Sequence, residues 1–312
     1  MTKNYKYSII IPHYNNPRLL QRLLKSIPNY DDIQIIVIDD CSTEYLLELD
    51  NLKKNNSHVD WLSTGSNGGA GKARNIGLSH ATGKYVLFAD CDDFFLEECK
   101  QIWDNATLNE NLDLIYFNIK TCDSITSKPL LEERQILTKL YKKYKVKNIL
   151  ISKLKMMHTQ PWAKIFKADY IKRNGFKFQE SSVANDYLFS IETSYSTNNL
   201  DCCTTMFYCY TYNENSISDN PLHDNKKLYE RIKVYDSVEK YCHIHNIKHY
   251  PYSAFIVSLI TKHFSKHKII KKYFEMNGKD WISELFYCTK RYISSYISSI
   301  KYEISSVITS DI

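Results

Sequence analysis

Short apolar segments alternate with segments of helical periodicity over the first 120 residues, and this alternation restricts the possible folds most strongly. Strands are predicted over five short apolar segments: 7–12, 33–40, 59–64, 84–90 and 112–119. Helices are predicted between them, over 18–27, 42–52 (with a Ser/Thr cap signal at its start), 70–81 and 94–106. Apolar strands that alternate with helices indicate an α/β fold with a mainly parallel central sheet covered on both faces.

Acidic residues cluster where two of the predicted strands end. Asp39 and Asp40 follow the second strand, and Asp90, Asp92 and Asp93 follow the fourth. Ligands of parallel sheets bind at the carboxyl ends of the strands, so these groups are expected to share one crevice. Carboxylates repel one another unless a cation or hydrogen-bond donors compensate them, and Mg²⁺ binds through one or two carboxylates together with substrate phosphates. The D-x-D pattern therefore suits a metal–diphosphate site, with helix capping from residue 94 as the alternative for Asp93.

Glycine is scarce, and half of it lies in one loop. Four of the eight glycines, Gly65, Gly68, Gly69 and Gly71, come just before or within the start of the helix predicted over 70–81. A dinucleotide-binding turn would directly follow the first strand, which here leads into PHYNNP. A P-loop would have Ser or Thr after Gly71-Lys72, where this chain has alanine. The sequence therefore disfavours nicotinamide and P-loop nucleotide sites.

Four motifs in order give the chain a family resemblance. SIIIPHYNN, IIVIDDCST, NGGAGKARNIGL and GKYVLFADCDD together resemble the successive motifs of glycosyltransferase family 2, which has the GT-A fold. A weaker similarity continues over 162–189 and 210–218. The resemblance implies a nucleotide-sugar donor, a Mg²⁺ or Mn²⁺ ion, and inverting transfer of the sugar.

The resemblance also implies a role for each matching residue. The residues expected to bind the donor are Pro12, Tyr14, Asp39, Asp40, Asn67, Lys72, Arg74 and Asp90. Asp40 would hydrogen-bond the uracil, Asp90 would contact the ribose, and Asp92 would ligate the metal that bridges the diphosphate. Arg74 and Lys72 would add positive charge, and the amides at the helix start near residue 70 would point at the phosphates. A solvated surface lysine is the alternative for Lys72.

An inverting transfer needs a base for the acceptor hydroxyl, and Asp186 matches the position that the family uses for it. Asn185 stands where the family usually has a glutamate, which removes a neighbour that could tune the pKa of Asp186. The alternative for Asp186 is a cap of the helix predicted over 187–195. Asp93 and Trp162 are candidates for the acceptor or sugar pocket, and Trp162 could equally be a core tryptophan.

Residues 1–217 are expected to form the catalytic domain, and residues 218–312 a helical C-terminal region. That region carries an apolar stripe with basic residues beside it: Tyr292, Tyr296, Ile300, Ile304 and Val307. Such a helix could contact a membrane surface peripherally, form a dimer, or pack on the catalytic domain. No apolar run approaches the ~20 residues of a membrane span, and the nine cysteines include no C-x-x-C pair. We therefore expect a cytoplasmic protein, at most peripheral at the inner face of the plasma membrane.

The expected activity is metal-dependent transfer of one sugar from a UDP-linked donor to a glycan or lipid-linked acceptor. A bacterial surface polysaccharide such as capsule or lipopolysaccharide is the expected product, and no nucleic-acid partner is expected at a net charge of only +6. One alternative is a sugar nucleotidyltransferase, which would need a glycine- and basic-rich signature where this chain has PHYNNP. Another is a catalytically silent carbohydrate-binding protein, which would predict loss of an acid that this chain retains at Asp92 and Asp186.

Overall fold

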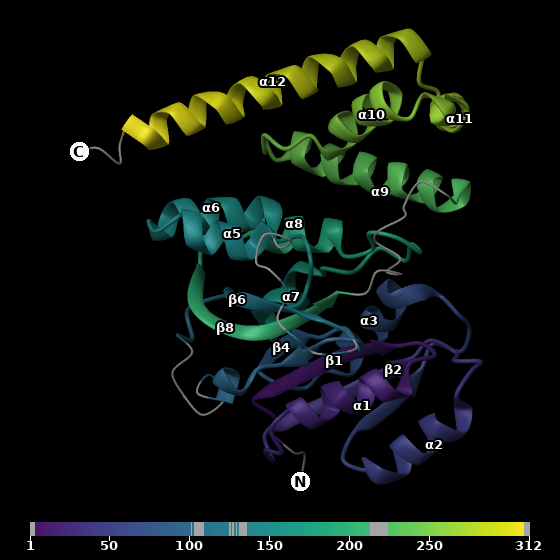
Figure 1. Ribbon diagram of the computed structural model, residues 1–312, viewed down its shortest axis with the longest axis vertical. Coiled ribbons are helices and arrows are strands. Elements are labelled where there is room, and N and C mark those ends of the chain that lie inside the picture. Colours follow the sequence, from purple (N-terminus) through teal and green to yellow (C-terminus); the bar gives the residue numbers. More distant parts are fainter. Residues whose placement is uncertain are drawn as a thin grey trace. The chain divides into compact units, whose positions relative to one another are not determined.

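The computed structural model describes residues 4–100, 102, 109–124, 126, 128, 130, 136–212 and 224–308, with the side chains of Phe264 and residues 295–308 left aside. The chain forms two compact units, Met1–Asp219 and Asn220–Ile312. The first is a mixed α/β unit, and the second consists of helices (Figure 1).

A sheet of eight strands, as far as the described residues show, forms the centre of the first unit. Its strands are β1 Tyr7–His13, β2 Ile33–Asp39, β3 Asp60–Ser63, β4 Tyr85–Phe88, β5 Phe94–Phe95, β6 Leu114–Asp123, β7 Lys164–Lys167 and β8 Leu200–Tyr212. Their spatial order is β3-β2-β1-β4-β7-β6-β8-β5. β1 runs parallel to β2 and β4, and β6 runs parallel to β8, whereas β7 is antiparallel to both β4 and β6. The sheet is therefore mainly parallel, as predicted, and β1, β2 and β4 end at the same edge.

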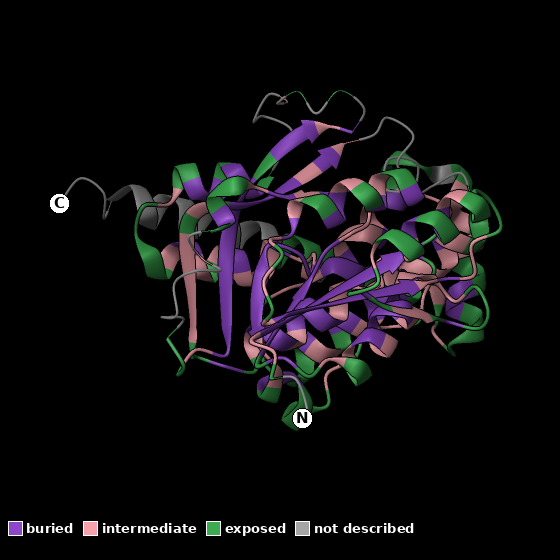
Figure 2. Ribbon diagram, turned by 90° about the horizontal axis from the view of Figure 1, so that it is seen from below, coloured by how far each residue is buried: buried purple, intermediate pink, exposed green. Residues whose placement is uncertain are grey.

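Helices cover this sheet. They are α1 Pro17–Ser26, α2 Leu46–Asn55, α3 Gly69–His80, α5 Ile136–Lys143, α6 Lys147–Met157, α7 Ala168–Asn174 and α8 Tyr187–Tyr195. α3 packs on β1 and β2, while α5 packs on β6 and α6 on β8 and α8 (Figure 1). Every residue of β1 is buried, and Figure 2 shows the central strands in the buried class. The apolar strand segments thus form the core because both faces of the sheet are covered.

Two predicted helix starts differ from the structure. Phe94–Phe95 is strand β5, paired with β8, and a 3₁₀ turn follows at Glu97–Cys99, so the helix predicted over 94–106 does not begin at residue 94. Most of residues 101–108 lie outside the described part of the chain. Helix α2 begins at Leu46 and not at the Ser/Thr signal, because Ser42 hydrogen-bonds to Asp39 instead of capping a helix. The pairing of β5 with β8 outweighs the local helix propensity in the first case, and the hydrogen bond from Ser42 to Asp39 does so in the second.

The second unit contains α9 Asn225–Ile244, α10 Pro251–Lys262, α11 His267–Met276 and α12 Trp281–Ile308. Lys279 links its helices, because its Nζ lies 2.7 Å from Glu284, 3.2 Å from Asp236 and 3.1 Å from the Tyr252 hydroxyl. No helix of the described residues is long and apolar enough to cross a membrane. Of the predicted apolar stripe, Tyr292 lies on α12, and the side chains of Tyr296, Ile300, Ile304 and Val307 lie outside the described residues.

Candidate active site

The first predicted site residues meet where β1 and β2 end. Asp39 Oδ1 lies 3.0 Å from His13 Nδ1 and accepts a hydrogen bond of 2.6 Å from the Ser42 hydroxyl. Burial raises the pKa of Asp39, but the hydrogen bonds from His13 and Ser42 outweigh it, so this pKa lies below its ordinary value. Asp39 is therefore held as a carboxylate at the carboxyl end of β2.

Asp40 organises the glycine-rich loop. Its buried carboxylate accepts hydrogen bonds from the amides of Gly68 (2.8 Å) and Gly69 (2.7 Å) and from the Thr64 hydroxyl (2.7 Å). Gly69 has φ of +80°, a conformation that favours glycine. We expected amides at this helix start to face a diphosphate. Those of Gly68 and Gly69 instead donate to Asp40, because an acid at a helix start can accept hydrogen bonds from its free N–H groups.

Arg74 differs most from its predicted role. The residue is 4% exposed, and its guanidinium donates to Asp90 Oδ1 (2.6 Å) and to Asn185 Oδ1 (2.7 Å). The ring of Phe178 lies 5.4 Å from the guanidinium carbon. Because Arg74 is paired and buried, it does not offer a free charge to the diphosphate. It instead joins the D-x-D segment after β4 to the segment that leads into α8.

Three residues that the sequence did not point to hold the D-x-D segment in place. Arg22 of α1 donates to the backbone carbonyl of Asp92, and the Thr211 hydroxyl donates to the same carbonyl at 2.6 Å. The Tyr208 hydroxyl accepts the amide of Asp90 at 2.9 Å. These contacts reach across 70 to 119 residues of sequence, so no local motif could reveal them.

Asp93 is a buried partner of β8 and not a helix cap. Its Oδ1 accepts the backbone amide of Thr211 at 2.7 Å, and the residue is 1% exposed. Burial and the negative charges of Asp92 and Asp90 raise the pKa of Asp93 well above its ordinary value. Its contact with strand β8 makes it a support of the D-x-D segment and leaves it unable to line an open sugar pocket.

Asp92 is the carboxylate of this segment that suits a divalent cation. Burial and the neighbouring charge of Asp90 raise the pKa of Asp92 to about 6, and the positive charge of Arg22 opposes this only in part, so a cation would favour its anionic form. Among the described residues, no three His, Cys, Asp or Glu side chains lie close enough together to hold an ion by themselves. An ion here would take only one or two protein carboxylates and would need the donor phosphates as further ligands, which is how Mg²⁺ is commonly bound.

Asp186 lies at the N-cap of α8 without capping it. The structure gives its side chain no cap hydrogen bond, although the backbone carbonyl accepts the amide of Ser190 at 3.0 Å. Burial raises the pKa of Asp186; the positive charge of Arg74 opposes this and the negative charge of Asp90 adds to it. A half-buried carboxylate with a raised pKa, free of a capping role, has the properties of a general base.

The remaining predicted residues are divided between the surface and the core. Tyr14, directly after β1, is 45% exposed, and Asn67, in the glycine-rich loop, is exposed, while Pro12 is buried inside β1. Lys72 donates to the Ser66 hydroxyl at 3.0 Å, within the glycine-rich loop. Trp162 is 2% exposed and stacks with the rings of Tyr208 and Tyr210, so it is a core tryptophan and presents no face to a sugar.

Gly71 brings α3 against the segment that leads to Asp186. A Cβ at this position would lie 2.1 Å from the Gln179 carbonyl oxygen and 3.0 Å from Asn185 Cβ.

Within a helix, Gly→Ala alone should stabilise the fold by about 0.5–1 kcal/mol, whereas overpacking costs about 1–3 kcal/mol. We expect Gly71→Ala to lower the melting temperature by a few degrees and to reduce turnover, because the segment before Asp186 must shift. His80→Ala, an exposed change in the same helix, is the control. A raised melting temperature for Gly71→Ala would contradict the contact.

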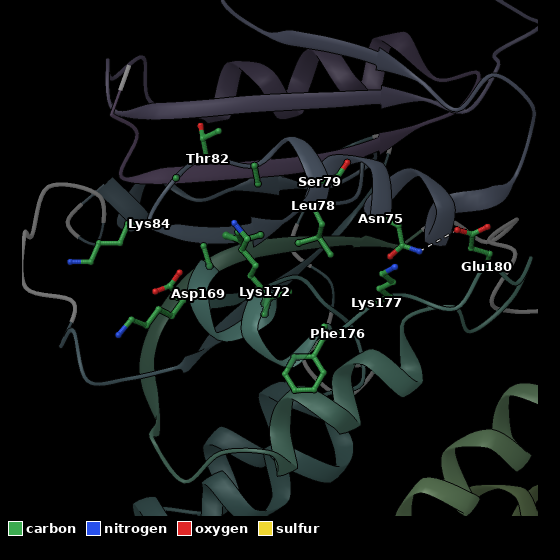
Figure 3. Close-up of a pocket in the computed structure, with 17 residues that line it drawn as sticks. Asn75, Leu78, Ser79, Thr82, Lys84, Asp169, Lys172, Phe176, Lys177 and Glu180 are labelled. Atoms are coloured by element: carbon green, nitrogen blue, oxygen red, sulfur yellow. Dashed lines mark hydrogen bonds between the residues drawn. The ribbon is translucent and has the colours of Figure 1, made fainter. Parts of the chain in front are cut away.

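A cavity of about 870 Å³ lies beside this region, between the end of α3, the start of β4 and α7 (Figure 3). Four lysines line it: Lys84, Lys167, Lys172 and Lys177. Lys84 is paired with Glu110, whereas Lys172 and Lys177 are exposed and have no acidic partner among the described residues. At its other end the cavity reaches Asn75 and Glu180, the latter on the segment that leads to Asp186. Its lining also contains Asp169 and apolar side chains such as Leu78 and Phe176.

Residues 8–175, more than half of the chain, match the family described as Glycosyl transferase family 2. The chain belongs to this family. It is 27% identical over 212 residues to the poly(ribitol-phosphate) β-N-acetylglucosaminyltransferase TarS of Staphylococcus aureus MW2, covering 66% of this chain and 35% of that protein. It is 28% identical over 247 residues to TarP of S. aureus N315, covering 75% and 72%. The chain thus spans about a third of the length of TarS.

Solved structures agree with the family assignment at the level of the fold. S. aureus TarS 1–349 in complex with UDP-GlcNAc matches with a TM-score of 0.58 and 24% identity, over 73% of this chain and 65% of that one. The mannosyltransferase PcManGT of Pyrobaculum calidifontis, in complex with GDP-Man and Mn²⁺, matches with a TM-score of 0.53 and 14% identity, over 96% and 88%. The predicted GT-A fold with additional C-terminal helices is therefore confirmed.

Proposed function

We propose that this glycosyltransferase transfers one sugar from a UDP-linked donor, with inversion and with a divalent cation, to a phosphate-bearing acceptor polymer. One observation carries the reaction type: the Arg74 guanidinium joins Asp90 of the D-x-D segment to Asn185, directly before Asp186. A donor-binding acid and a candidate base are thereby fixed relative to each other. Such fixed positioning of donor and base is what an inverting displacement requires.

Each residue has a separate part in this scheme. Asp39 and Tyr14 would border the pocket for the uracil, and Asp40 would shape the glycine-rich loop around the donor. Asp92 would hold the cation, which would neutralise charge on the departing diphosphate. Asp186 would take the proton of the acceptor hydroxyl as the oxygen attacks the anomeric carbon from the face opposite the diphosphate.

The acceptor is proposed from charge complementarity. Lys172 and Lys177 present positive charge at the rim of the cavity beside α7, and Lys84 and Lys167 line the same cavity. TarS and TarP are named for action on poly(ribitol-phosphate), a chain with a negative charge in each phosphate-linked unit. Gly175, Phe176, Lys177 and Glu180 line the cavity, and the same segment leads to Asp186. A polymer of this class would occupy the cavity while one of its hydroxyls lies beside Asp186.

Reversing two lysine charges tests this acceptor assignment. For the double variant Lys172→Glu/Lys177→Glu we expect the KM for a poly(ribitol-phosphate) acceptor to rise about tenfold, with the affinity for UDP unchanged. The increase should shrink at high ionic strength, because exposed charges are screened. Lys54→Glu on α2, an exposed lysine outside the cavity, is the matched control. Equal KM values for the double variant and the control would contradict the proposed acceptor site.

The reaction itself is tested by a donor screen with mass detection of the product. UDP-linked hexoses and N-acetylhexosamines are incubated with the full chain, Mn²⁺ and the acceptor polymer, and each mixture is repeated without acceptor. Addition of one sugar mass to the acceptor supports transfer. Release of UDP at the same rate with and without acceptor would show hydrolysis and would contradict a transferase role.

A further inference from the structure

Helix α12 is apolar on two opposite faces. Its inner face packs on α10 and α11, where Trp281 joins the apolar cluster of the second unit and Cys288 is buried (Figure 1). Its outer face is exposed and carries large apolar side chains: Ile282 is 76% exposed, Phe286 is 73% exposed and Ile293 is 50% exposed. A surface helix of a globular unit normally has polar side chains on its outer face, so this face needs an explanation.

The three exposed apolar residues form one row along α12, which we call the outer row. They follow one another at intervals of four and seven residues, so in a helix of 3.6 residues per turn they point to nearly the same side. Lys290 lies in this row, four residues after Phe286, and is exposed. Glu284 is the acid of α12 between residues 281 and 294, and its carboxylate is turned to Lys279, 2.7 Å away. The described outer face therefore presents apolar groups and a positive charge without an exposed acid.

The net charge of the chain lies in the unit that carries the outer row. Residues 220–312 contain 15 of the 41 basic and 9 of the 35 acidic residues, which gives this unit a formal charge of +6. Residues 1–219 contain 26 of each and have no net charge.

The charge imbalance is larger on the surface of the second unit than in its composition. Within residues 224–294 nine lysines are exposed: Lys226, Lys233, Lys240, Lys248, Lys262, Lys268, Lys271, Lys272 and Lys290. The exposed acids of the same range are Asp224, Glu275 and Asp280. Asp236 and Glu239, by contrast, are buried and accept hydrogen bonds from groups inside the unit. The surface around the outer row is therefore strongly basic.

Apolar side chains together with many lysines are complementary to the headgroup region of a membrane that contains anionic lipids. The apolar groups enter the boundary with the acyl chains, while the lysines stay beside the negative headgroups. A second copy of this chain fits less well, because each copy would bring the same positive surface to the contact. A soluble anionic polymer would bind the lysines but would leave the outer row in water.

We propose that α12 attaches this enzyme peripherally to the surface of a membrane that contains anionic lipids. Ile282, Phe286 and Ile293 enter the interface, and exposed lysines of the second unit contact the headgroups. This inference goes beyond the proposed function and does not depend on it, because every residue that carries it lies in the second unit.

Flotation with lipid vesicles tests the attachment of the full chain. At about 0.05 M salt, vesicles of phosphatidylglycerol and phosphatidylcholine should carry the enzyme, and vesicles of phosphatidylcholine alone should carry little of it. At about 0.5 M salt the bound fraction should fall severalfold, because salt screens the attraction between exposed lysines and headgroups. No binding to the anionic vesicles at low salt, or equal binding to the two kinds of vesicle, would overturn the proposal.

Replacement of the outer row tests which face is responsible. The triple variant Ile282→Ser/Phe286→Ser/Ile293→Ser should bind anionic vesicles at least about tenfold more weakly, because it removes the apolar groups that enter the interface. Its melting temperature and its turnover should stay unchanged, since the three side chains are exposed and lie outside the catalytic unit. Vesicle binding equal to that of the parent chain would show that the lysines alone hold the anion, and would overturn the role of the row.

The matched control replaces three exposed apolar residues elsewhere in the chain. Leu47→Ser/Val146→Ser/Ile244→Ser changes residues on α2, before α6 and at the end of α9, and should leave vesicle binding unchanged. An equal loss of binding in the control and in the triple variant of the outer row would contradict the assignment to α12.

Two further measurements identify the alternative contacts. Light scattering that shows a dimeric parent chain and a monomeric triple variant, with no vesicle binding by either, would assign the outer row to a contact between copies. A lower melting temperature of the triple variant, again without vesicle binding by the parent chain, would show that the row packs on the catalytic unit. Either result would overturn the proposal.

A tryptophan in the outer row gives a test that does not need the triple variant to fold. Phe286→Trp keeps an aromatic side chain at an exposed position, and Ile244→Trp places the same reporter at the exposed end of α9. With anionic vesicles that contain brominated lipid, Phe286→Trp should lose more fluorescence than the parent chain, and Ile244→Trp should not. Equal quenching in the two variants would overturn the insertion of this face.

Discussion

Asp186→Asn should reduce turnover by about 10²–10⁴-fold, the usual contribution of general acid–base catalysis. Asparagine keeps the size of the side chain and can still occupy the N-cap of α8, but it cannot take the proton of the acceptor hydroxyl. The affinity for UDP should change little, because within the described part of the chain no hydrogen bond or ion pair joins the Asp186 side chain to the residues proposed to bind the donor. Steady-state kinetics and calorimetry with UDP measure the two quantities separately.

The stability of Asp186→Asn has an expected sign as well. Folding raises the pKa of Asp186, so its ionisation destabilises the folded state once the pH is above that raised value. Asparagine has no charge to bury, so the variant should melt at the same temperature as the parent chain or slightly higher at neutral pH. Asp224→Asn, at the N-cap of α9, makes the same change at another helix start and should keep full turnover. Near-normal turnover for Asp186→Asn would place the base elsewhere.

The parallel half of the sheet and most of the crevice could be predicted from sequence because their signals are local. β1, β2 and β4 are mostly apolar, and the acids Asp39–Asp40 and Asp90–Asp93 come at or just after the ends of β2 and β4. In a parallel sheet those ends meet at one edge, so the sequence order alone brings the acids together. The parallel topology of α/β folds is therefore enough to predict from the sequence that these acids lie close together.

The second half of the site could not be predicted in the same way, because its contacts are long-range. Strand β8 has a mixed burial pattern and pairs with β6 through a register irregularity near Phe117. Its Tyr208 and Thr211 contact the D-x-D segment from 118 and 119 residues away. Without the pairing of β6 and β8, nothing in the sequence connects these residues to the acids.

The role of Arg74 could not be predicted from the sequence, because its local pattern fits two different environments. A basic residue after a glycine-rich loop suggests a phosphate ligand, and the same pattern is compatible with a buried ion pair. The partners decide between the two, and Asp90 and Asn185 lie 16 and 111 residues away. Asn185 is also where the chain departs from the usual family pattern, so the hydrogen bond from Arg74 gives that departure a structural role. The neutral amide leaves Asp186 without a second acid beside it in sequence.

Removal of the divalent cation should have the other large effect on this enzyme. With Mn²⁺ present we expect UDP to bind at least about tenfold more tightly than in EDTA, because the ion offsets the repulsion between the diphosphate and the acids after β4. Asp92→Asn should abolish that difference and lower turnover by about 10²–10³-fold, since a cation at the leaving group contributes several kcal/mol. Calorimetry with UDP in Mn²⁺ and in EDTA gives the first quantity for both proteins.

The control for this prediction is Asp50→Asn, an exposed acid on α2 that should leave the Mn²⁺ effect unchanged. Asp92→Asn should also fold normally, because burial and the charge of Asp90 raise the pKa of Asp92 to about 6 and its ionised form is therefore unfavourable in the folded state at neutral pH. A loss of activity by Asp92→Asn can then be assigned to the ion and not to instability. Equal UDP affinity with Mn²⁺ and with EDTA in the parent chain would contradict a role for the cation in donor binding. The hydrogen bonds from Arg22 and Thr211 to the D-x-D backbone would then remain as the main structural feature of this segment.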